Sequence, residues 1–138
     1  MGDVFLDTDV AFDILSKRQP HFPDSVKLLQ LAAGGKIRLM ISEGSLATLF
    51  YLSFDIYKIQ NAAIKLLEFV KACELVHANK QVVSGALQSA FRNKEDALQY
   101  FTALNAGAEY FVTRNIRDYK NAVTNLPVML PVDLVKNI

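Results

Sequence analysis

Hydrophobic residues form two kinds of pattern along this chain. Short continuous apolar runs predict strands that are covered on both faces, as in a parallel sheet. Longer segments, in which apolar residues recur every three or four positions, predict amphipathic helices. We expect the strands at residues 4–6, 37–41, 75–76, 110–113 and 128–130. We expect the helices at residues 10–17, 24–33, 43–54, 59–70, 82–91 and 94–106, with a short one from residue 131.

Two of these helices carry stripes that should face the core. In the third helix the apolar residues at this spacing are Leu46, Leu49, Phe50 and Phe54, which predicts one buried stripe. The fourth helix repeats the pattern with Ile59, Ala63, Leu66, Leu67 and Val70. Helix boundaries agree with local signals, since Ser42 and Asn93 are good N-caps and Gly107 is a good terminator.

Strands that alternate with helices predict an α/β fold. We expect a three-layer α/β/α architecture with a central, mostly parallel sheet of four to five strands. The chain has 138 residues, shows no repeat or linker, and is predicted to be a single domain over residues 1–138.

Composition and charge exclude several classes of protein. The net charge of +1 gives no general attraction to nucleic acid, so any polyanion must be met by a local patch or through bound metal. The single cysteine, Cys73, excludes an internal disulfide and a thiolate metal cluster. No apolar run approaches the ~20 residues of a membrane helix, and the N-terminus lacks the features of a secretory signal. We therefore expect a cytoplasmic protein without a membrane partner.

Polar residues gather where the predicted strands end. In open parallel sheets, sites form at the carboxyl ends of strands. The acidic or amide residues that follow the predicted strands, or begin the helix before the fourth strand, are Asp7, Asp9, Glu43, Glu95, Asp96, Asn115 and Asp118. These residues come from separate segments, and we expect them to converge at one edge of the sheet.

Each acid also has a purely structural interpretation. Asp9 can cap the first helix, and Glu43 in a first helical turn is favourable against the helix dipole. Asp96 lies three residues after a capping Asn, and Asp118 suits a turn. Asp7 is the exception, because it follows three apolar strand residues directly. The convergence of the acids therefore carries more weight than any single residue.

A cluster of carboxylates without histidine or thiolate favours hard divalent cations such as Mg²⁺ or Mn²⁺. Such ions can activate water at a phosphodiester and let an acidic pocket accept an anionic substrate. The two histidines, His21 and His77, are isolated from any partner at metal-ligand spacing. The cations near the predicted site that could meet phosphates are Arg92, Lys94, Arg114 and Arg117.

Several motifs resemble those of PIN-domain proteins. Residues 4–10, with Asp13 shortly after, are similar to the family's opening of apolar strand, Asp-Thr-Asn, then Val or Ile. Residues 42–52 resemble the second motif, and residues 94–115 resemble the third and fourth. The resemblance covers nearly the whole chain in the family's order and spacing.

This resemblance implies a central parallel sheet and an acidic pocket that binds Mg²⁺ or Mn²⁺. It also implies ribonuclease activity on an RNA substrate, as in the VapC-like toxins of bacterial toxin–antitoxin pairs. The family further implies a homodimer and neutralisation by a small antitoxin protein whose tail enters the pocket.

Site residues can be carried over by position from the resemblance. Asp7 and Asp96 match two core metal-site acids, and Asp118 matches a supporting acid of the fourth motif. Thr113 matches a polar position beside the metals. Thr113 and Asn115 would orient water or a metal ligand during hydrolysis.

The sequence departs from the family pattern at three positions. Thr48 stands where the second motif carries Glu, Asn115 stands where many members have Asp, and Asp9 stands where most have Asn. Glu43 cannot occupy the position of Thr48, but it or Asp9 could complete the metal shell from a helix start. A branch of the family with Thr in the second motif is most similar.

Two other functions compete with the nuclease. The domain could keep the PIN fold and bind RNA or protein without cutting, because Thr48 and Asn115 replace usual acids. A haloacid-dehalogenase-type phosphatase also begins with a strand and Asp-x-Asp, with Asp7 as the nucleophile, although Ala11 departs from that motif. A response-regulator receiver fits worse, since Asp55 falls in or near a predicted helix.

Overall fold

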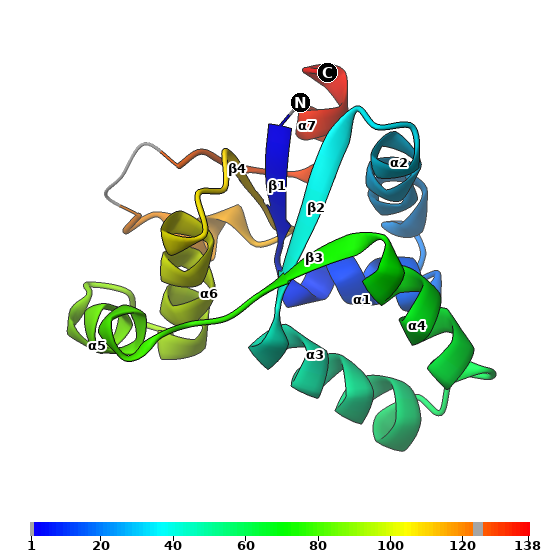
Figure 1. Ribbon diagram of the computed structural model, residues 1–138, viewed down its shortest axis with the longest axis horizontal. Helices are drawn as coiled ribbons and strands as arrows, with labels where there is room; N and C mark the ends of the chain where they lie inside the picture. Colours follow the sequence, from blue (N-terminus) through cyan, green and yellow to red (C-terminus); the bar gives the residue numbers. More distant parts are fainter. Residues whose placement is uncertain (1, 123–125) are drawn as a thin grey trace.

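A five-stranded parallel sheet forms the centre of the molecule. The computed structural model describes residues 2–122 and 126–138. The strands lie in the order β3-β2-β1-β4-β5, and every neighbouring pair is parallel. Their bounds are β1 Gly2–Leu6, β2 Ile37–Ser42, β3 Cys73–Val76, β4 Tyr110–Val112 and β5 Val128–Met129. Figure 1 shows β1 and β2 at the centre, with helices on both sides.

Helices connect the strands along the chain. The α-helices are α1 Thr8–Ser16, α2 Phe22–Ala33, α3 Glu43–Phe50, α4 Ala62–Lys71, α5 Lys80–Gln88, α6 Lys94–Asn105 and α7 Pro131–Lys136. A π-helical turn, η1 (Tyr51–Ile56), continues α3, and a 3₁₀ turn, η2 (Ile116–Tyr119), follows β4. The predicted α/β fold with a parallel sheet is therefore confirmed, with element ends shifted by a few residues.

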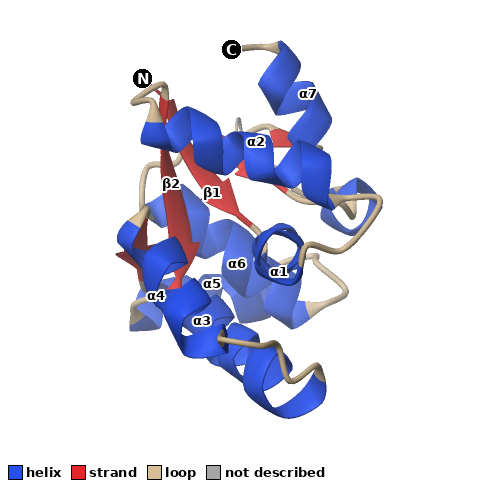
Figure 2. Cartoon of the chain, turned by 90° about the vertical axis from the view of Figure 1, so that its right-hand side faces the viewer, coloured by secondary structure: helices blue, strands red, loops and turns tan. Residues whose placement is uncertain are grey.

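The sheet separates two hydrophobic clusters. Val4 and Leu6 of β1 pack in one cluster with residues of α1, α2, α3, α4 and α7. Phe5 points the other way and packs in a second cluster with residues of α5, α6 and η2. Figure 2 shows α1 to α4 in front of the sheet, with α5 and α6 behind them. A wholly apolar strand such as β1 is expected in a sheet that is covered on both faces.

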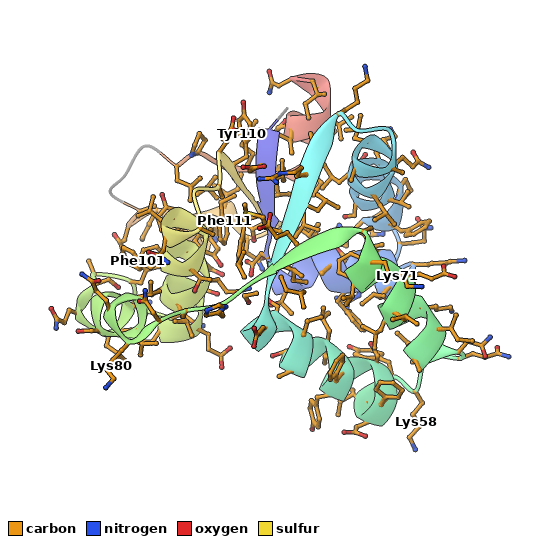
Figure 3. All side chains as sticks on the ribbon, in the orientation of Figure 1. Lys58, Lys71, Lys80, Phe101, Tyr110 and Phe111 are labelled. Atoms are coloured by element: carbon orange, nitrogen blue, oxygen red, sulfur yellow. The ribbon has the colours of Figure 1, made fainter. Side chains whose placement is uncertain are left out.

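Aromatic rings fill the cluster between the sheet and α6. Phe5 and Phe111 stack with ring centroids 5.3 Å apart, and Tyr100 packs against Phe111 at 5.5 Å. Figure 3 shows Phe111 and Phe101 on this side of the sheet. The ring of Tyr119 lies 4.7 Å from that of Phe111, so η2 is anchored in the same cluster. This packing places the residues after β4 beside the start of α6.

The predicted stripe of the third helix is only partly correct. Leu46 and Leu49 are buried, but Phe50 and Phe54 are 48% and 47% exposed. The reason is that α3 continues into η1, and this segment extends away from the sheet (Figure 1). Ser53 is the buried residue of η1. Phe50 and Phe54 instead pack edge-to-face against each other, with centroids 6.5 Å apart.

The predicted stripe of the fourth helix is also partly correct, since Ile59, Leu66 and Val70 pack in or against the core while Ala63 and Leu67 are exposed. The fully buried residues of α4 are Ala62, Leu66 and Phe69, whereas Leu67 is 56% exposed. Leu66 alone belongs both to the predicted stripe and to these fully buried residues.

Among the described residues, no helix combines the length and apolar character needed to cross a membrane.

Candidate active site

Asp7 lies at the carboxyl end of β1 and is almost fully buried, with 7% of its surface exposed. Its Oδ2 accepts hydrogen bonds from the Thr113 hydroxyl at 2.9 Å and from the Tyr119 hydroxyl at 2.8 Å. Its Oδ1 accepts from the backbone N–H of Thr8 at 2.9 Å, and the Gln99 amide nitrogen lies 3.4 Å away. Three donors from three segments therefore fix this carboxylate, and it also serves as the N-cap of α1.

Asp96 lies in the first turn of α6 and approaches Asp7 through Tyr119. The Tyr119 hydroxyl is 3.4 Å from Asp96 Oδ1 and 2.8 Å from Asp7 Oδ2. A phenol carries one hydrogen, so it can donate to only one carboxylate at a time. The Asn93 side chain caps α6 by accepting from the backbone N–H of Asp96 at 3.1 Å, which leaves the Asp96 carboxylate available to the pocket.

Asp9 receives several donors from the segment after β4. Its Oδ2 accepts from the backbone N–H of Arg114 at 3.2 Å and from the Asn115 amide at 3.0 Å, and the Thr113 hydroxyl oxygen lies 3.4 Å away. Its Oδ1 accepts from the backbone N–H of Val10 at 2.7 Å. Asp9 therefore connects α1 to the segment between β4 and η2. This is a structural role in addition to its position in the site.

The carboxylates raise one another's pKa. Burial, followed by the charge of Asp7, raises the pKa of Asp9 to about 6. Burial, followed by the charges of Asp7 and Asp118, raises the pKa of Asp96 to about 6. Burial and the charge of Asp7 also raise the pKa of the Tyr119 phenol, so it stays a donor. The site therefore concentrates negative charge that the protein only partly compensates.

A small open pocket of about 200 Å³ collects most of the predicted site residues. Its lining residues are Asp7, Thr8, Asp9, Thr48, Glu95, Asp96, Gln99 and Asn115. Thr113 lies beneath it, fully buried, and donates to Asp7. Asp118 lines the neighbouring pocket with Asp96 and is close enough to raise the pKa of Asp96. The structure thus brings together acids from three segments of the chain.

Glu43 lies outside this pocket. Its side chain is 65% exposed, and Oε1 lies 3.8 Å from Nδ1 of His77. Thr48, five residues further along, lines the pocket instead. Glu43 starts α3, and the helix turns its side chain toward the β3–α5 connection, so the structure does not group it with the other predicted ligands.

The carboxylates of this pocket are candidate ligands for a divalent cation. Among residues 2–122 and 126–138, no three His, Cys, Asp or Glu side chains are already arranged as a metal site. Asp7 and Asp96 nevertheless present carboxylate oxygens to one pocket, and their repulsion raises the pKa of Asp96. Carboxylate oxygens are the ligands that Mg²⁺ and Mn²⁺ prefer, so this donor set fits such an ion.

Sequence reasoning missed Tyr119 and Gln99. Tyr119 resembles an ordinary core aromatic in the sequence, and its hydroxyl is placed only by the fold of η2. Gln99 is a neutral residue on α6, one turn after Asp96. Gln99 lies three residues after Asp96, and residues at this spacing share a helix face. The sequence therefore did indicate that Gln99 lies on the same side of the helix as Asp96.

Gln99 is the centre of a polar network that joins three helices. Its amide nitrogen donates to Thr8 Oγ1 at 3.2 Å and to Ser45 Oγ, and its oxygen accepts from Ser42 Oγ at 2.6 Å. Thr8 and Ser45 also hydrogen-bond each other at 2.7 Å. This network connects α1, α3 and α6 directly beside Asp7.

Two of the four cations near the predicted site are engaged in structural contacts. Arg114 Nε lies 2.6 Å from Oδ2 of Asp13, a residue with no exposed surface. Lys94 donates to the backbone oxygen of Ser89 at 2.9 Å. The other two, Arg92 and Arg117, line the pocket that contains Asp118.

Comparison with known proteins agrees with the fold. The PIN-domain family model matches residues 3–117. The structure is similar to VapBC2 from Rickettsia felis bound to a promoter DNA fragment, with a TM-score of 0.71, 20% identity, and coverage of 93% of this chain and 98% of that one. It is also similar to DNA-bound VapBC from Salmonella typhimurium, with a TM-score of 0.69, 17% identity and coverage of 95% and 99%.

A third similar structure is VapC20 from Mycobacterium tuberculosis, described as a sarcin–ricin loop cleaving toxin. Its TM-score is 0.64 at 13% identity, with coverage of 89% of this chain and 98% of that one. At such identities the likeness shows the shared fold. No curated protein matches the sequence.

Proposed function

The chain belongs to the PIN-domain family, and from this premise we propose that it is a metal-dependent endoribonuclease, the toxin of a toxin–antitoxin pair. The main support for the proposal is that the Tyr119 hydroxyl lies within hydrogen-bond distance of both Asp7 and Asp96 at the edge of an open acidic pocket. The similarity to VapC20, a toxin described as cleaving the sarcin–ricin loop, supports RNA as the substrate.

Asp7 and Asp96 would hold the divalent cation, with Asp118 and Asp9 as further carboxylates near it. A bound Mg²⁺ or Mn²⁺ would supply positive charge for the phosphate and acidify a water molecule. Asp9 and Asp96, with pKa values near 6, are mostly ionised at neutral pH and available as ligands. Glu43 lies outside the pocket and is not needed in this arrangement.

The remaining residues of the site would position the acids. Thr113 and Tyr119 both donate to Oδ2 of Asp7, so an ion would bind at Oδ1, which accepts only from the backbone N–H of Thr8 and has the Gln99 amide nitrogen 3.4 Å away. Asn115 donates to Asp9 and lies at the pocket surface, where its amide can also contact water or RNA. These hydrogen bonds fix the carboxylates before substrate arrives, which lowers the cost of reorganisation.

Cleavage of structured RNA by the purified protein, with Mn²⁺ and with EDTA, tests the proposal. We expect cleavage only with metal, and Asp7→Asn should lower the rate at least about 10³-fold, since it removes a central ligand charge. Asp55→Asn, on the exposed turn η1, is the matched control and should cleave normally. Equal cleavage in EDTA would exclude the metal mechanism.

A non-catalytic PIN module is the second candidate, and Thr48 favours it. Thr48 lines the pocket where the family's second motif carries Glu, so this wall contributes no charge. Titration calorimetry with Mn²⁺ separates the two candidates. Binding that is lost in Asp7→Asn supports the nuclease, whereas RNA binding without measurable Mn²⁺ binding supports the module.

For the antitoxin, we infer a docking groove between α1, α2 and α4. A cavity of about 420 Å³ there is lined mainly by apolar side chains, including Leu15, Phe22 and Leu29, with Lys17 and Glu68 at its border. An apolar groove with charged borders suits an amphipathic helix of a small partner. Leu29→Glu should weaken antitoxin binding without changing RNA cleavage, which a pull-down with the neighbouring gene's product would measure.

For the homodimer, we infer an interface on η1 and α4. The exposed large apolar residues of this region are Phe50, Tyr51, Phe54, Ile56, Tyr57, Ile64 and Leu67. Contiguous exposed apolar surface of this kind marks association sites. Light scattering should show a dimer for the wild type and a monomer for Phe54→Asp, and a monomeric wild type would contradict the inference.

A further inference from the structure

A second, larger pocket adjoins the acidic one. Its volume is about 720 Å³, within the usual range of ligand sites. It lies between the start of α6 and the residues after η2, and its lining residues are Ala90, Arg92, Asn93, Asp96, Arg117, Asp118, Lys120 and Asn121. Asn121 donates to the backbone oxygen of Ala90 at 3.2 Å, and this bond holds the two sides of the pocket together.

Three cations at this pocket have no acidic partner within the described part of the chain. Arg92, Arg117 and Lys120 are all exposed, and none forms an ion pair there. By contrast, Arg114 is paired with buried Asp13. The unpaired cations are therefore free to meet an external anion.

The two pockets form one continuous surface with opposite charge. Asp96 lines both of them, so a strand bound in the acidic pocket can extend beside the cations. The chain as a whole has a net charge of only +1, so this local concentration of cations is not a general property of the surface. The N-terminal end of α6 adds positive potential at the same place.

We propose that this basic pocket binds a phosphate of the RNA strand next to the phosphodiester that is cut. The proposal rests on the proposed ribonuclease function, and it places the flanking nucleotide beside Arg92, Arg117 and Lys120. Phosphate contacts of this kind position a strand without reading its bases. RNA is favoured over an acidic peptide because the cations adjoin the acids that would act on a phosphodiester.

The test compares two double variants that remove the same charge. Arg92→Ala with Lys120→Ala removes two of the three cations of the basic pocket, and neither residue is part of the acid cluster. Lys36→Ala with Lys136→Ala is the control, since Lys36 precedes β2 and Lys136 lies in α7, both away from the carboxyl edge of the sheet (Figure 1).

Cleavage is measured on a long single-stranded RNA and on a dinucleotide that lacks flanking phosphates. The pocket variant should raise KM for the long RNA about tenfold, with kcat within about twofold, and should leave dinucleotide cleavage unchanged. The salt dependence of long-RNA binding, followed by fluorescence anisotropy in EDTA, should fall in slope by about 0.7, the value for one lost phosphate contact on a single strand.

The outcomes separate this proposal from the proposed function. Cleavage of both RNAs with the same KM in wild type and pocket variant would overturn the phosphate site and leave the nuclease standing. RNA binding that depends on the pocket, without cleavage by the wild type, would keep the phosphate site and overturn the nuclease. Binding of a poly-glutamate peptide in preference to RNA would contradict the phosphate site.

Discussion

The two walls of the acidic pocket are built differently. The strand wall, formed by Asp7, Asp9, Thr113 and Tyr119, is dense with hydrogen bonds, and three donors hold the Asp7 carboxylate. The helix wall consists of Thr48 on α3, which is exposed and whose hydroxyl has only a distant contact, 3.5 Å from the backbone oxygen of Gly44. The protein therefore fixes the acids of the strand wall and leaves the α3 wall uncharged, while α6 adds Glu95 and Asp96 to the lining.

Gln99 is the physical link between these walls. It contacts Asp7 and Thr8 on one side and Ser42 and Ser45, at the start of α3, on the other. Together with the direct Thr8–Ser45 hydrogen bond of 2.7 Å, this amide fixes the position of the helix wall relative to the acids. Each prediction below changes one wall or this link.

The largest effect is expected for Gln99→Met, which keeps the side-chain volume but removes the amide. Buried Ser42 and Ser45 would lose a partner, so the free energy of unfolding should fall by about 2–3 kcal/mol. Urea denaturation measures this change. Gln88→Met on exposed α5 is the control and should change stability by less than about 0.5 kcal/mol. A loss as small as that of the control would show that the walls are held by packing alone.

Tyr119→Phe weakens the strand wall while keeping the ring in its aromatic cluster. Loss of a hydrogen bond to the Asp7 carboxylate should lower the free energy of unfolding by about 2 kcal/mol and reduce kcat about tenfold. Tyr51→Phe, at an exposed position on η1, serves as the control. Unchanged kcat in Tyr119→Phe would mean that the hydroxyl does not position Asp7.

Thr48→Glu adds the missing charge to the helix wall. A further carboxylate facing the pocket should tighten Mn²⁺ binding about fivefold, or about 1 kcal/mol. Calorimetry compares it with Ala47→Glu, which adds the same charge at an exposed neighbouring position that does not line the pocket. Equal tightening in both variants would indicate a general charge effect.

The smallest effect is expected for Asp96→Asn in metal-free buffer. The pKa of Asp96 is raised from 3.8 to about 6, so the native state binds the proton more tightly than the unfolded chain, and stability falls as pH rises through this window. At pH 7 the variant should be more stable by up to about 1 kcal/mol, after screening by solvent. The gain should shrink as pH falls toward 4, which thermal melts of wild type and variant at both pH values would measure. A destabilised Asp96→Asn at pH 7 would contradict the repulsion.

The sequence predicted the elements that depend on local patterns. Apolar runs such as 4–6 identified the strands, and the rule that sites form at strand ends led to Asp7. Asp96 was found through the family resemblance and through its place at a helix start. The structure groups Asp7, Asp9 and Asp96 in one pocket, while their roles as metal ligands stay a prediction.

What the sequence missed depends on the direction of single side chains. Phe50 and Phe54 have helical spacing, but periodicity does not reveal where a helix extends beyond the sheet. Glu43 has the right chemistry and strand-end position, yet its place in the first turn directs it toward His77. Tyr119 and Gln99 have neutral side chains, so no charge pattern singled them out.

The ion pair of Asp13 with Arg114 means that loss of activity will not by itself identify a catalytic residue. Asp13 has no exposed surface, and without Arg114 its carboxylate would keep only the longer ion pair with Arg18 at 3.7 Å, so the free energy of unfolding should fall by up to about 3–5 kcal/mol. Because Arg114 lies between Thr113 and Asn115, the same change would also displace the segment that holds Asp7 and Asp9. Under the proposed toxin function, a genetic screen for harmless variants should therefore recover substitutions at Asp13 and Arg114 as well as at Asp7, and low protein abundance would distinguish the first two from the third.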